Sequence, residues 1–132
     1  MAKVLVVEDD ENILALVQSR LAKAGHQVMT ATSAPAALEL IDERGGPDIT
    51  VLDVGLPGLD GLELLDAIRE RPELASMPAV FLSGRVQAED VARGREKGAR
   101  YLTKPFVATA LLRAVDEALA EARDAEGAPR GW

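Results

Sequence analysis

The sequence contains no cysteine, a single histidine and few aromatic residues. Without cysteine the chain forms no disulfide bond and no thiolate metal site. His26 alone cannot build an imidazole metal cluster or a catalytic dyad, and its place after Gly25 at a helix end predicts a surface position. Any metal ion bound by this chain must therefore be a hard cation held by oxygen ligands.

The chain also lacks an excess of positive charge and any long hydrophobic run. Its formal net charge of −7 argues against direct nucleic-acid binding, because a basic surface supplies most of the affinity in such complexes. No apolar stretch approaches the roughly 20 residues of a membrane span. Residues 1–3 lead into an apolar run without the pattern of a secretory signal. We expect a cytoplasmic protein without membrane contact.

What is present is a globular composition, with 48% hydrophobic and 28% charged residues in a chain of 132. Short apolar runs alternate five times with segments of helical period, and the nearly uniform apolarity of several runs favours strands covered by helices on both faces. We expect a (βα)₅ doubly wound α/β domain in residues 1–123 and a C-terminal tail or linker stub in residues 124–132. The expected strands cover residues 4–7, 27–31, 49–53, 80–82 and 100–103.

Local signals also predict how the helices begin and how stable they are. Asp10 is expected to cap the first helix and Ser33 the second, because their side chains can accept bonds from free backbone N–H groups. The helix expected over residues 87–97 contains Gly94, and Val91 is nearly its only large apolar residue. Glycine there costs roughly 1 kcal/mol relative to alanine, so this helix should lie at the low-stability end of the domain, where movable parts are found.

Polar residues follow four of the five apolar runs. Because the carboxyl ends of parallel strands lie along one edge of a sheet, these side chains should converge on one site. Carboxylates about 4 Å apart repel by several kcal/mol at an effective dielectric constant near 20, so a proton or a cation must relieve them. Mg²⁺ fits such oxygen ligands, and Mn²⁺ could replace it. The residues concerned are Glu8, Asp9, Asp53, Ser83 and Lys104.

The same residues form a set suited to accepting a phosphoryl group. Asp53 ends a strand and precedes a glycine-rich loop, so its carboxylate has room to attack phosphorus and form an acyl phosphate. A phosphoryl group in transfer carries charge on three oxygens. A metal ion can neutralise one of them, Lys104 a second, and Ser83 with nearby N–H groups a third.

Four motifs, taken in order, resemble the receiver domain of bacterial two-component response regulators. They are residues 6–10 (VVEDD), 52–61 (LDVGLPGLDG), 81–84 (FLSG) and 98–106 (GARYLTKPF). The resemblance covers about residues 2–122. It implies a flavodoxin-like fold with strand order 2-1-3-4-5.

The resemblance also implies a role for each matching residue. Asp53 would be the phosphoacceptor, and the metal would be held by Glu8, Asp9, Asp53 and the backbone carbonyl of Gly55. Ser83 and Tyr101 would be the switch hydroxyl and the switch aromatic. Lys104 would pair with the phosphoryl group, and the Lys104–Pro105 peptide bond would be cis. The residues at positions 55 and 85, here Gly55 and Arg85, would set how long the phosphoryl group persists.

The implied function is a signalling switch and not an enzyme, beyond catalysis of its own phosphorylation and dephosphorylation. A sensor histidine kinase or a phosphotransfer protein would supply the phosphoryl group. A downstream effector protein, or an output domain that is separate or removed, would read the face formed by the fourth helix, the fifth strand and the fifth helix. Two alternatives stay open: a scaffold of the same fold that works without phosphorylation, and a phosphomonoester hydrolase. The hydrolase is disfavoured because Gly55 stands where haloacid-dehalogenase-type enzymes need a second acid.

Overall fold

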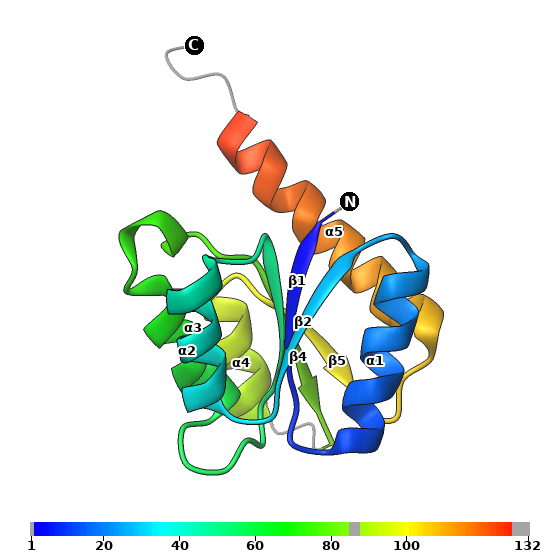
Figure 1. Cartoon of the computed structure of the whole chain (residues 1–132). Coiled ribbons are helices and arrows are strands. Elements are labelled where there is room, and N and C mark those ends of the chain that lie inside the picture. Colours follow the sequence, from blue (N-terminus) through cyan, green and yellow to red (C-terminus); the bar gives the residue numbers. More distant parts are fainter. Residues whose placement is uncertain (1, 85–87, 128–132) are drawn as a thin grey trace.

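Five parallel strands form a single sheet in the order β2-β1-β3-β4-β5, which confirms the predicted topology (Figure 1). The structure is a computed structural model that describes residues 2–84 and 88–127. The strands are β1 (Lys3–Val7), β2 (Gln27–Ala31), β3 (Ile49–Asp53), β4 (Ala79–Ser83) and β5 (Arg100–Thr103).

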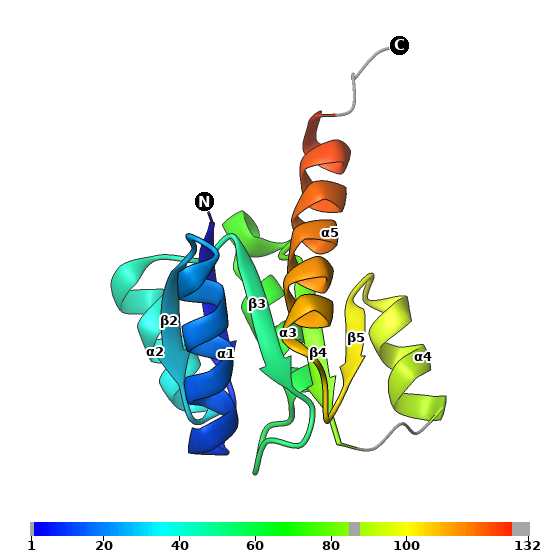
Figure 2. The ribbon, with the colours of Figure 1, turned by 90° about the vertical axis from the view of Figure 1, so that its right-hand side faces the viewer.

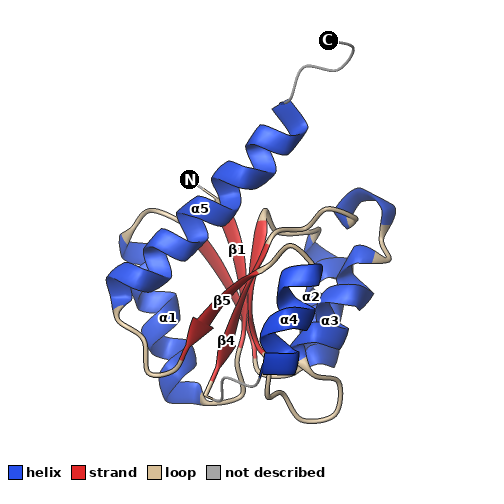
Figure 3. Ribbon diagram, turned by 180° about the vertical axis from the view of Figure 1, so that it is seen from behind, coloured by secondary structure: helices blue, strands red, loops and turns tan. Residues whose placement is uncertain are grey.

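Helices cover both faces of the sheet. Helices α1 and α5 lie on one face, and α2, α3 and α4 lie on the other (Figures 1 and 3). Figure 2, turned by 90°, shows the outer helix α4 beside the edge strand β5. The helices are α1 (Glu11–Lys23), α2 (Ala34–Arg44), α3 (Gly61–Arg69), a 3₁₀ turn η1 (Pro72–Leu74), α4 (Ala88–Glu96) and α5 (Ala108–Gly127).

The strands divide the core into two halves because successive side chains of a strand point to opposite faces. In β1, Val4 and Val6 join the core beneath α1 and α5, whereas Leu5 and Val7 join the core beneath α2 and α3. All four side chains are fully buried. Full burial of an aliphatic side chain contributes roughly 1.5–3 kcal/mol, so a strand with no exposed face must be apolar along its length.

Side-chain caps fix the residues at which helices α1 and α2 begin. The Asp10 carboxylate accepts hydrogen bonds from the N–H groups of Asn12 (2.9 Å) and Ile13 (3.2 Å), and the Ser33 hydroxyl oxygen accepts one from Ala36 (3.3 Å). Both predicted caps are therefore present. Because α1 begins directly after Asp10, the residues just before it are held at the carboxyl edge of the sheet.

The last helix is longer than the sequence pattern indicated. Residues 124–127, expected in the tail, form the last turn of α5, which ends at Gly127. The glycine, proline and charges of residues 124–132 favoured a tail, but Ala125 and Glu126 are good helix formers, and the strong helix breakers come only at Gly127 and Pro129. The division of the chain at residue 123 stays a prediction.

Helix α3 begins in close contact with the backbone of β3. A Cβ atom on Gly61 would lie 2.4 Å from the backbone oxygen of Asp53. We expect Gly61→Ala to lower the free energy of unfolding by about 2 kcal/mol, because the rigid backbone must shift to accept the methyl group. Gly84→Ala is the matched control, since nothing lies within 4 Å of its Cβ position. Urea unfolding measures both, and equal losses in the two variants would contradict the prediction.

Candidate functional site

Three carboxylates meet at the carboxyl edge of the sheet. Glu8 and Asp9 follow β1, Asp53 ends β3, and their oxygen atoms lie within 4.8 Å of one another. Glu8 is fully buried and Asp53 is 5% exposed, whereas Asp9 is exposed to solvent. The predicted convergence of these side chains is therefore observed, and the cluster is open to solvent on the Asp9 side.

Lys104 supplies the positive charge of the cluster. Its Nζ atom lies 2.5 Å from Glu8 Oε1 and 3.4 Å from Asp53 Oδ1. Its backbone N–H donates to the carbonyl oxygen of Ser83 at 2.7 Å, which joins the ends of β4 and β5. The Lys104–Pro105 peptide bond is cis. The ammonium group is thus placed between two carboxylates.

Backbone N–H groups hold two of the carboxylates in place. The N–H of Gly55 donates to Asp53 Oδ1 at 3.1 Å, and the N–H of Asp10 donates to Glu8 Oε2 at 3.2 Å. Asp10 and Gly55 each lie two residues after the carboxylate that accepts their hydrogen bond, so the local turn orients that carboxylate. Gly55 therefore lies at the site through its N–H group, and metal binding by its carbonyl oxygen stays a prediction.

The electrostatic environment shifts the protonation of three groups. Burial raises the pKa of Glu8 to about 7, although the ion pair with Lys104 opposes this effect. Burial by itself would lower the pKa of Lys104, but the ion pair with Glu8 and the charge of Asp53 raise it. Burial is the largest single influence on Asp9 and opposes its ionisation, yet the hydrogen bonds with Asp53 and Glu8 together lower its pKa. Burial therefore favours protonation of Glu8, and a bound cation would oppose it.

The shift at Glu8 predicts a pH dependence of stability without metal. Because its pKa is about 7 in the folded protein and 4.5 in the unfolded chain, the folded state binds more protons between these values. The free energy of unfolding should fall as pH rises from 4.5 to about 7 and then level off, by about 3 kcal/mol at most. Urea unfolding in EDTA measures this change. Glu8→Gln should lose it, and parallel pH curves for the two proteins would contradict the assignment.

The residues present fit a divalent cation. All available ligand atoms are oxygens, which Mg²⁺ and Mn²⁺ prefer. Within the described residues, Glu8 Oε1 is buried and has no well-directed hydrogen bond, although Lys104 lies close to it. A buried oxygen in that state gains from a cation or an ordered water molecule. Glu8, Asp9 and Asp53 could therefore hold the metal.

The predicted switch hydroxyl, Ser83, lies beside the carboxylate cluster, and the predicted switch aromatic, Tyr101, lies in the neighbouring strand. Ser83 ends β4 and is buried, and Tyr101 in β5 is half-buried. The Tyr101 ring packs on Phe81, with ring centroids 6.2 Å apart and planes inclined at 55°. Among the described residues the buried Tyr101 hydroxyl has no hydrogen-bond partner. The predicted lifetime residue Arg85 lies outside the described residues.

Sequence reasoning missed the packing role of Gly94. A Cβ atom at this position would lie 3.3 Å from carbon atoms of both Phe81 and Tyr101, so the helix backbone rests directly on the two rings. The glycine that weakens α4 in isolation therefore permits its close contact with the sheet. A glycine inside a helix rich in charged residues is the sequence signal that could have indicated this contact.

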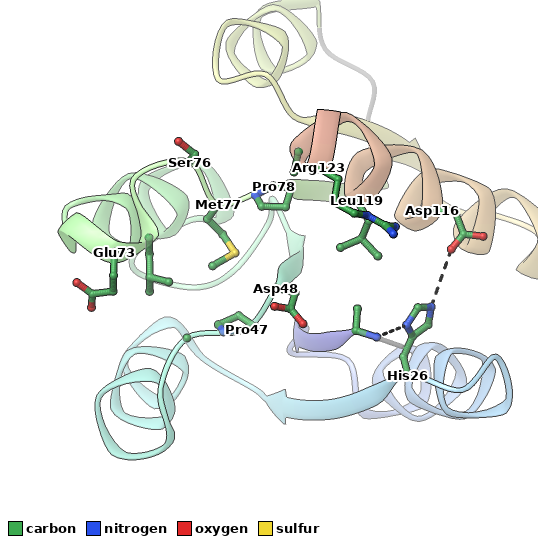
Figure 4. Close-up of a pocket in the computed structure, with 14 residues that line it drawn as sticks. His26, Pro47, Asp48, Glu73, Ser76, Met77, Pro78, Asp116, Leu119 and Arg123 are labelled. Atoms are coloured by element: carbon green, nitrogen blue, oxygen red, sulfur yellow. Dashed lines mark hydrogen bonds and ion pairs between the residues drawn. The ribbon is translucent and has the colours of Figure 1, made fainter. Parts of the chain in front are cut away.

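A hollow of about 710 Å³ lies at the opposite edge of the sheet (Figure 4). There His26 Nδ1 accepts a hydrogen bond from the N–H of Ala2 (3.2 Å), and its Nε2 lies 4.0 Å from Asp116. The His26 side chain is only 10% exposed, so its predicted surface position is wrong. Asp48 on the same rim accepts a bond from the Lys3 N–H. These groups join β1 to its neighbours and lie far from the carboxylate cluster.

Comparison with known proteins agrees with this geometry. The family profile described as "Response regulator receiver domain" matches residues 4–116. The chain is 40% identical over 119 residues to the transcriptional regulatory protein AfsQ1 of Streptomyces coelicolor, covering 87% of this chain and 51% of that protein. It is 31% identical to protein PilH of Pseudomonas aeruginosa, covering 91% of this chain and 99% of that protein. The chain spans about half the length of several curated relatives that it matches.

Solved structures agree as well. The crystal structure of NtrX from Brucella abortus superposes with a TM-score of 0.86 at 35% identity, covering 96% of this chain and 28% of that one. Across residues 2–84 and 88–127, no helix combines the length and the apolar character needed to cross a bilayer.

Proposed function

This chain belongs to the response regulator receiver domain family, and we propose that it accepts a phosphoryl group on Asp53 and thereby switches the binding of a partner. The observation that carries the proposal is the placement of Asp53 within 4.8 Å of two other carboxylate oxygens and 3.4 Å from Lys104. Receiver domains of this family are signalling domains. We infer that the donor is a sensor histidine kinase or a phosphotransfer protein, and that the chain works in the cytoplasm.

The reaction proposed is transfer from a phosphohistidine. An oxygen of the Asp53 carboxylate attacks phosphorus, so an O–P bond forms while the P–N bond of the donor breaks and its electron pair returns to the imidazole, which takes a proton. The Gly55 N–H bond to Oδ1 orients the attacking carboxylate. Mg²⁺ or Mn²⁺ held by Glu8, Asp9 and Asp53, with Gly55 contributing its carbonyl, would neutralise charge on the phosphoryl oxygens.

Lys104 and Ser83 would stabilise the product. The Lys104 ammonium group already lies between Glu8 and Asp53, so it needs little movement to pair with a phosphoryl oxygen. Ser83 lies at the end of the neighbouring strand β4, where its hydroxyl could donate to a second oxygen. Both groups act before and after transfer without a change of fold.

The switch would spread from Ser83 to Tyr101. A turn of Ser83 toward the phosphoryl group leaves space that the Tyr101 ring can fill, and its unpaired buried hydroxyl supports such a rearrangement within the described residues. Because α4 rests on this ring at Gly94, the face formed by α4, β5 and α5 would change shape. A downstream effector protein or a separate output domain would bind that face.

Intact mass after incubation with Mg²⁺ and a small phosphodonor tests the proposal. We expect a gain of one phosphoryl group, and none when EDTA removes the metal. The scaffold alternative predicts no gain under either condition, and the hydrolase alternative predicts multiple turnovers of a phosphate ester. An unchanged mass with Mg²⁺ present would end the proposal.

A further inference from the structure

Helix α3 makes direct contact with the phosphoacceptor at one end and with the connection between α4 and β5 at the other. At its start, Gly61 lies against the backbone oxygen of Asp53, and its N–H donates to the carbonyl of Val54 at 3.3 Å. A capping box secures this end: Glu63 N–H donates to Asp60 Oδ1 (2.9 Å), and Asp60 N–H donates to Glu63 Oε1 (3.3 Å). The first turn of α3 is therefore fixed to the site.

The last turn of α3 holds the segment that follows α4. The Arg69 guanidinium donates from Nε (3.1 Å) and Nη2 (2.7 Å) to the carbonyl of Met77, and from Nη1 to the carbonyl of Lys97 (2.7 Å). The Lys97 ammonium group returns to α3 and donates to both carboxylate oxygens of Asp66, at 2.7 and 2.9 Å. We call Asp66, Arg69 and Lys97 the α3–α4 joint.

The α3–α4 joint holds a helix end that is closed by backbone hydrogen bonds. The N–H of Ala99 donates to the carbonyl of Gly94 (3.0 Å), and the N–H of Gly98 donates to that of Arg95 (2.9 Å). With Gly98 at a φ of 71°, this is a Schellman motif, which satisfies the last carbonyls of α4. A displacement of Lys97 therefore moves the end of α4 and the start of β5 together, because the motif links them.

Between its two ends α3 is stiff. It is buried against the sheet through Leu62, Leu65 and Ile68, none of which is exposed to solvent. Nine residues of α-helix are about 13 Å long, and interior packing at crystal-like density passes a displacement on rather than absorbing it.

We propose that α3 is a second coupling route, which carries the change at Asp53 to the α4–β5 connection through the α3–α4 joint, independently of Ser83 and Tyr101. The route rests on the phosphoacceptor role proposed above. Phosphorylation adds about −1.5 to −2 charge at the start of α3, where the positive end of the helix dipole attracts it. The resulting force acts along the axis of α3, and Arg69 transmits it to the carbonyl of Lys97.

Hydrogen exchange on three proteins tests this route: wild type, Arg69→Met and Arg71→Met, each with and without Mg²⁺ and a small phosphodonor. Arg71 is a control because its guanidinium group is also held near the end of α3, but by the Asp42 carboxylate and the backbone carbonyl of Ala67 and not by the segment that follows α4. Phosphoryl uptake is followed by mass in the same samples. The amides of residues 97–99 report on the α4–β5 connection.

In wild type and Arg71→Met, phosphorylation should change the exchange of amides 97–99. In Arg69→Met, uptake should stay within about twofold of wild type while that change falls about fivefold, the lower end of ordinary coupling between sites. Lys97→Met removes only the exposed ion pair with Asp66, so it should reduce the change in exchange on phosphorylation less than Arg69→Met does. It replaces Arg69→Met in the test if that variant does not fold.

A full response in Arg69→Met, an equal loss in Arg71→Met, or no response in phosphorylated wild type would overturn the route and leave the phosphoacceptor role standing. If wild type takes up no phosphoryl group, both proposals fall together.

Discussion

Replacement of Asp53 by asparagine is expected to abolish phosphoryl uptake. The carboxylate oxygen is the nucleophile of the proposed reaction, and an amide of the same shape cannot form the acyl phosphate. We expect the rate of uptake from a small phosphodonor to fall at least about 10³-fold, as when a nucleophile is removed from other covalent catalysts. Intact mass spectrometry over a time course measures the rate in both proteins.

The fold should survive this change. Asp53 lies beside Glu8 and Asp9, so loss of its charge removes repulsion, and the free energy of unfolding should stay equal or rise. Asp116→Asn is the control: its side chain is 73% exposed and belongs to the opposite edge of the sheet. Uptake at the wild-type rate in Asp53→Asn, or an equal loss in Asp116→Asn, would show that the phosphoryl group goes elsewhere.

Replacement of Lys104 by methionine should have the second largest effect. Methionine keeps an unbranched stem and removes the charge that faces the transferred group, so uptake should fall about 10²-fold, as for loss of one electrostatic donor in an active site. The variant should also unfold more easily, because fully buried Glu8 loses its ion pair. Glu8 can take up a proton, which offsets part of the cost of losing the ion pair, so we expect the free energy of unfolding to fall by about 2 kcal/mol.

A double variant separates the two effects of Lys104. Lys104→Met combined with Glu8→Gln removes the buried acid as well, so stability at neutral pH should return toward the wild-type value. Phosphoryl uptake should remain low because the ammonium group is still absent. Urea unfolding and the mass time course measure both quantities. Recovery of uptake in the double variant would mean that Lys104 acts only by neutralising Glu8 and does not pair with the phosphoryl group.

The placement of the site along the chain could be predicted because it depends on local patterns. Glu8, Asp53 and Lys104 each follow an apolar run of strand length, and the carboxyl ends of parallel strands share one edge. Asp10 and Ser33 could be recognised as caps because a cap bonds to residues two or three positions further on. Such signals are contained within short segments, so they are readable before the fold is known.

The environment of each residue could not be predicted in the same way. Glu8 and Asp9 are neighbours in the chain, yet one is fully buried with a raised pKa and the other is exposed with a lowered pKa. Lys104 lies closer to Glu8 than to Asp53, and Gly94 rests on two rings. Each of these facts depends on atoms contributed by several distant segments.

The amino-acid sequence by itself determined the alternation of strands and helices along the chain, the helix caps and the set of residues at the carboxyl edge of the sheet, because periodicity and capping act over a few neighbouring residues. Only the tertiary structure decided which carboxylate has a raised pKa, how α4 contacts Tyr101 and how Arg69 joins α3 to Lys97. Burial, charge and close contact sum over many segments that meet only when the chain is folded.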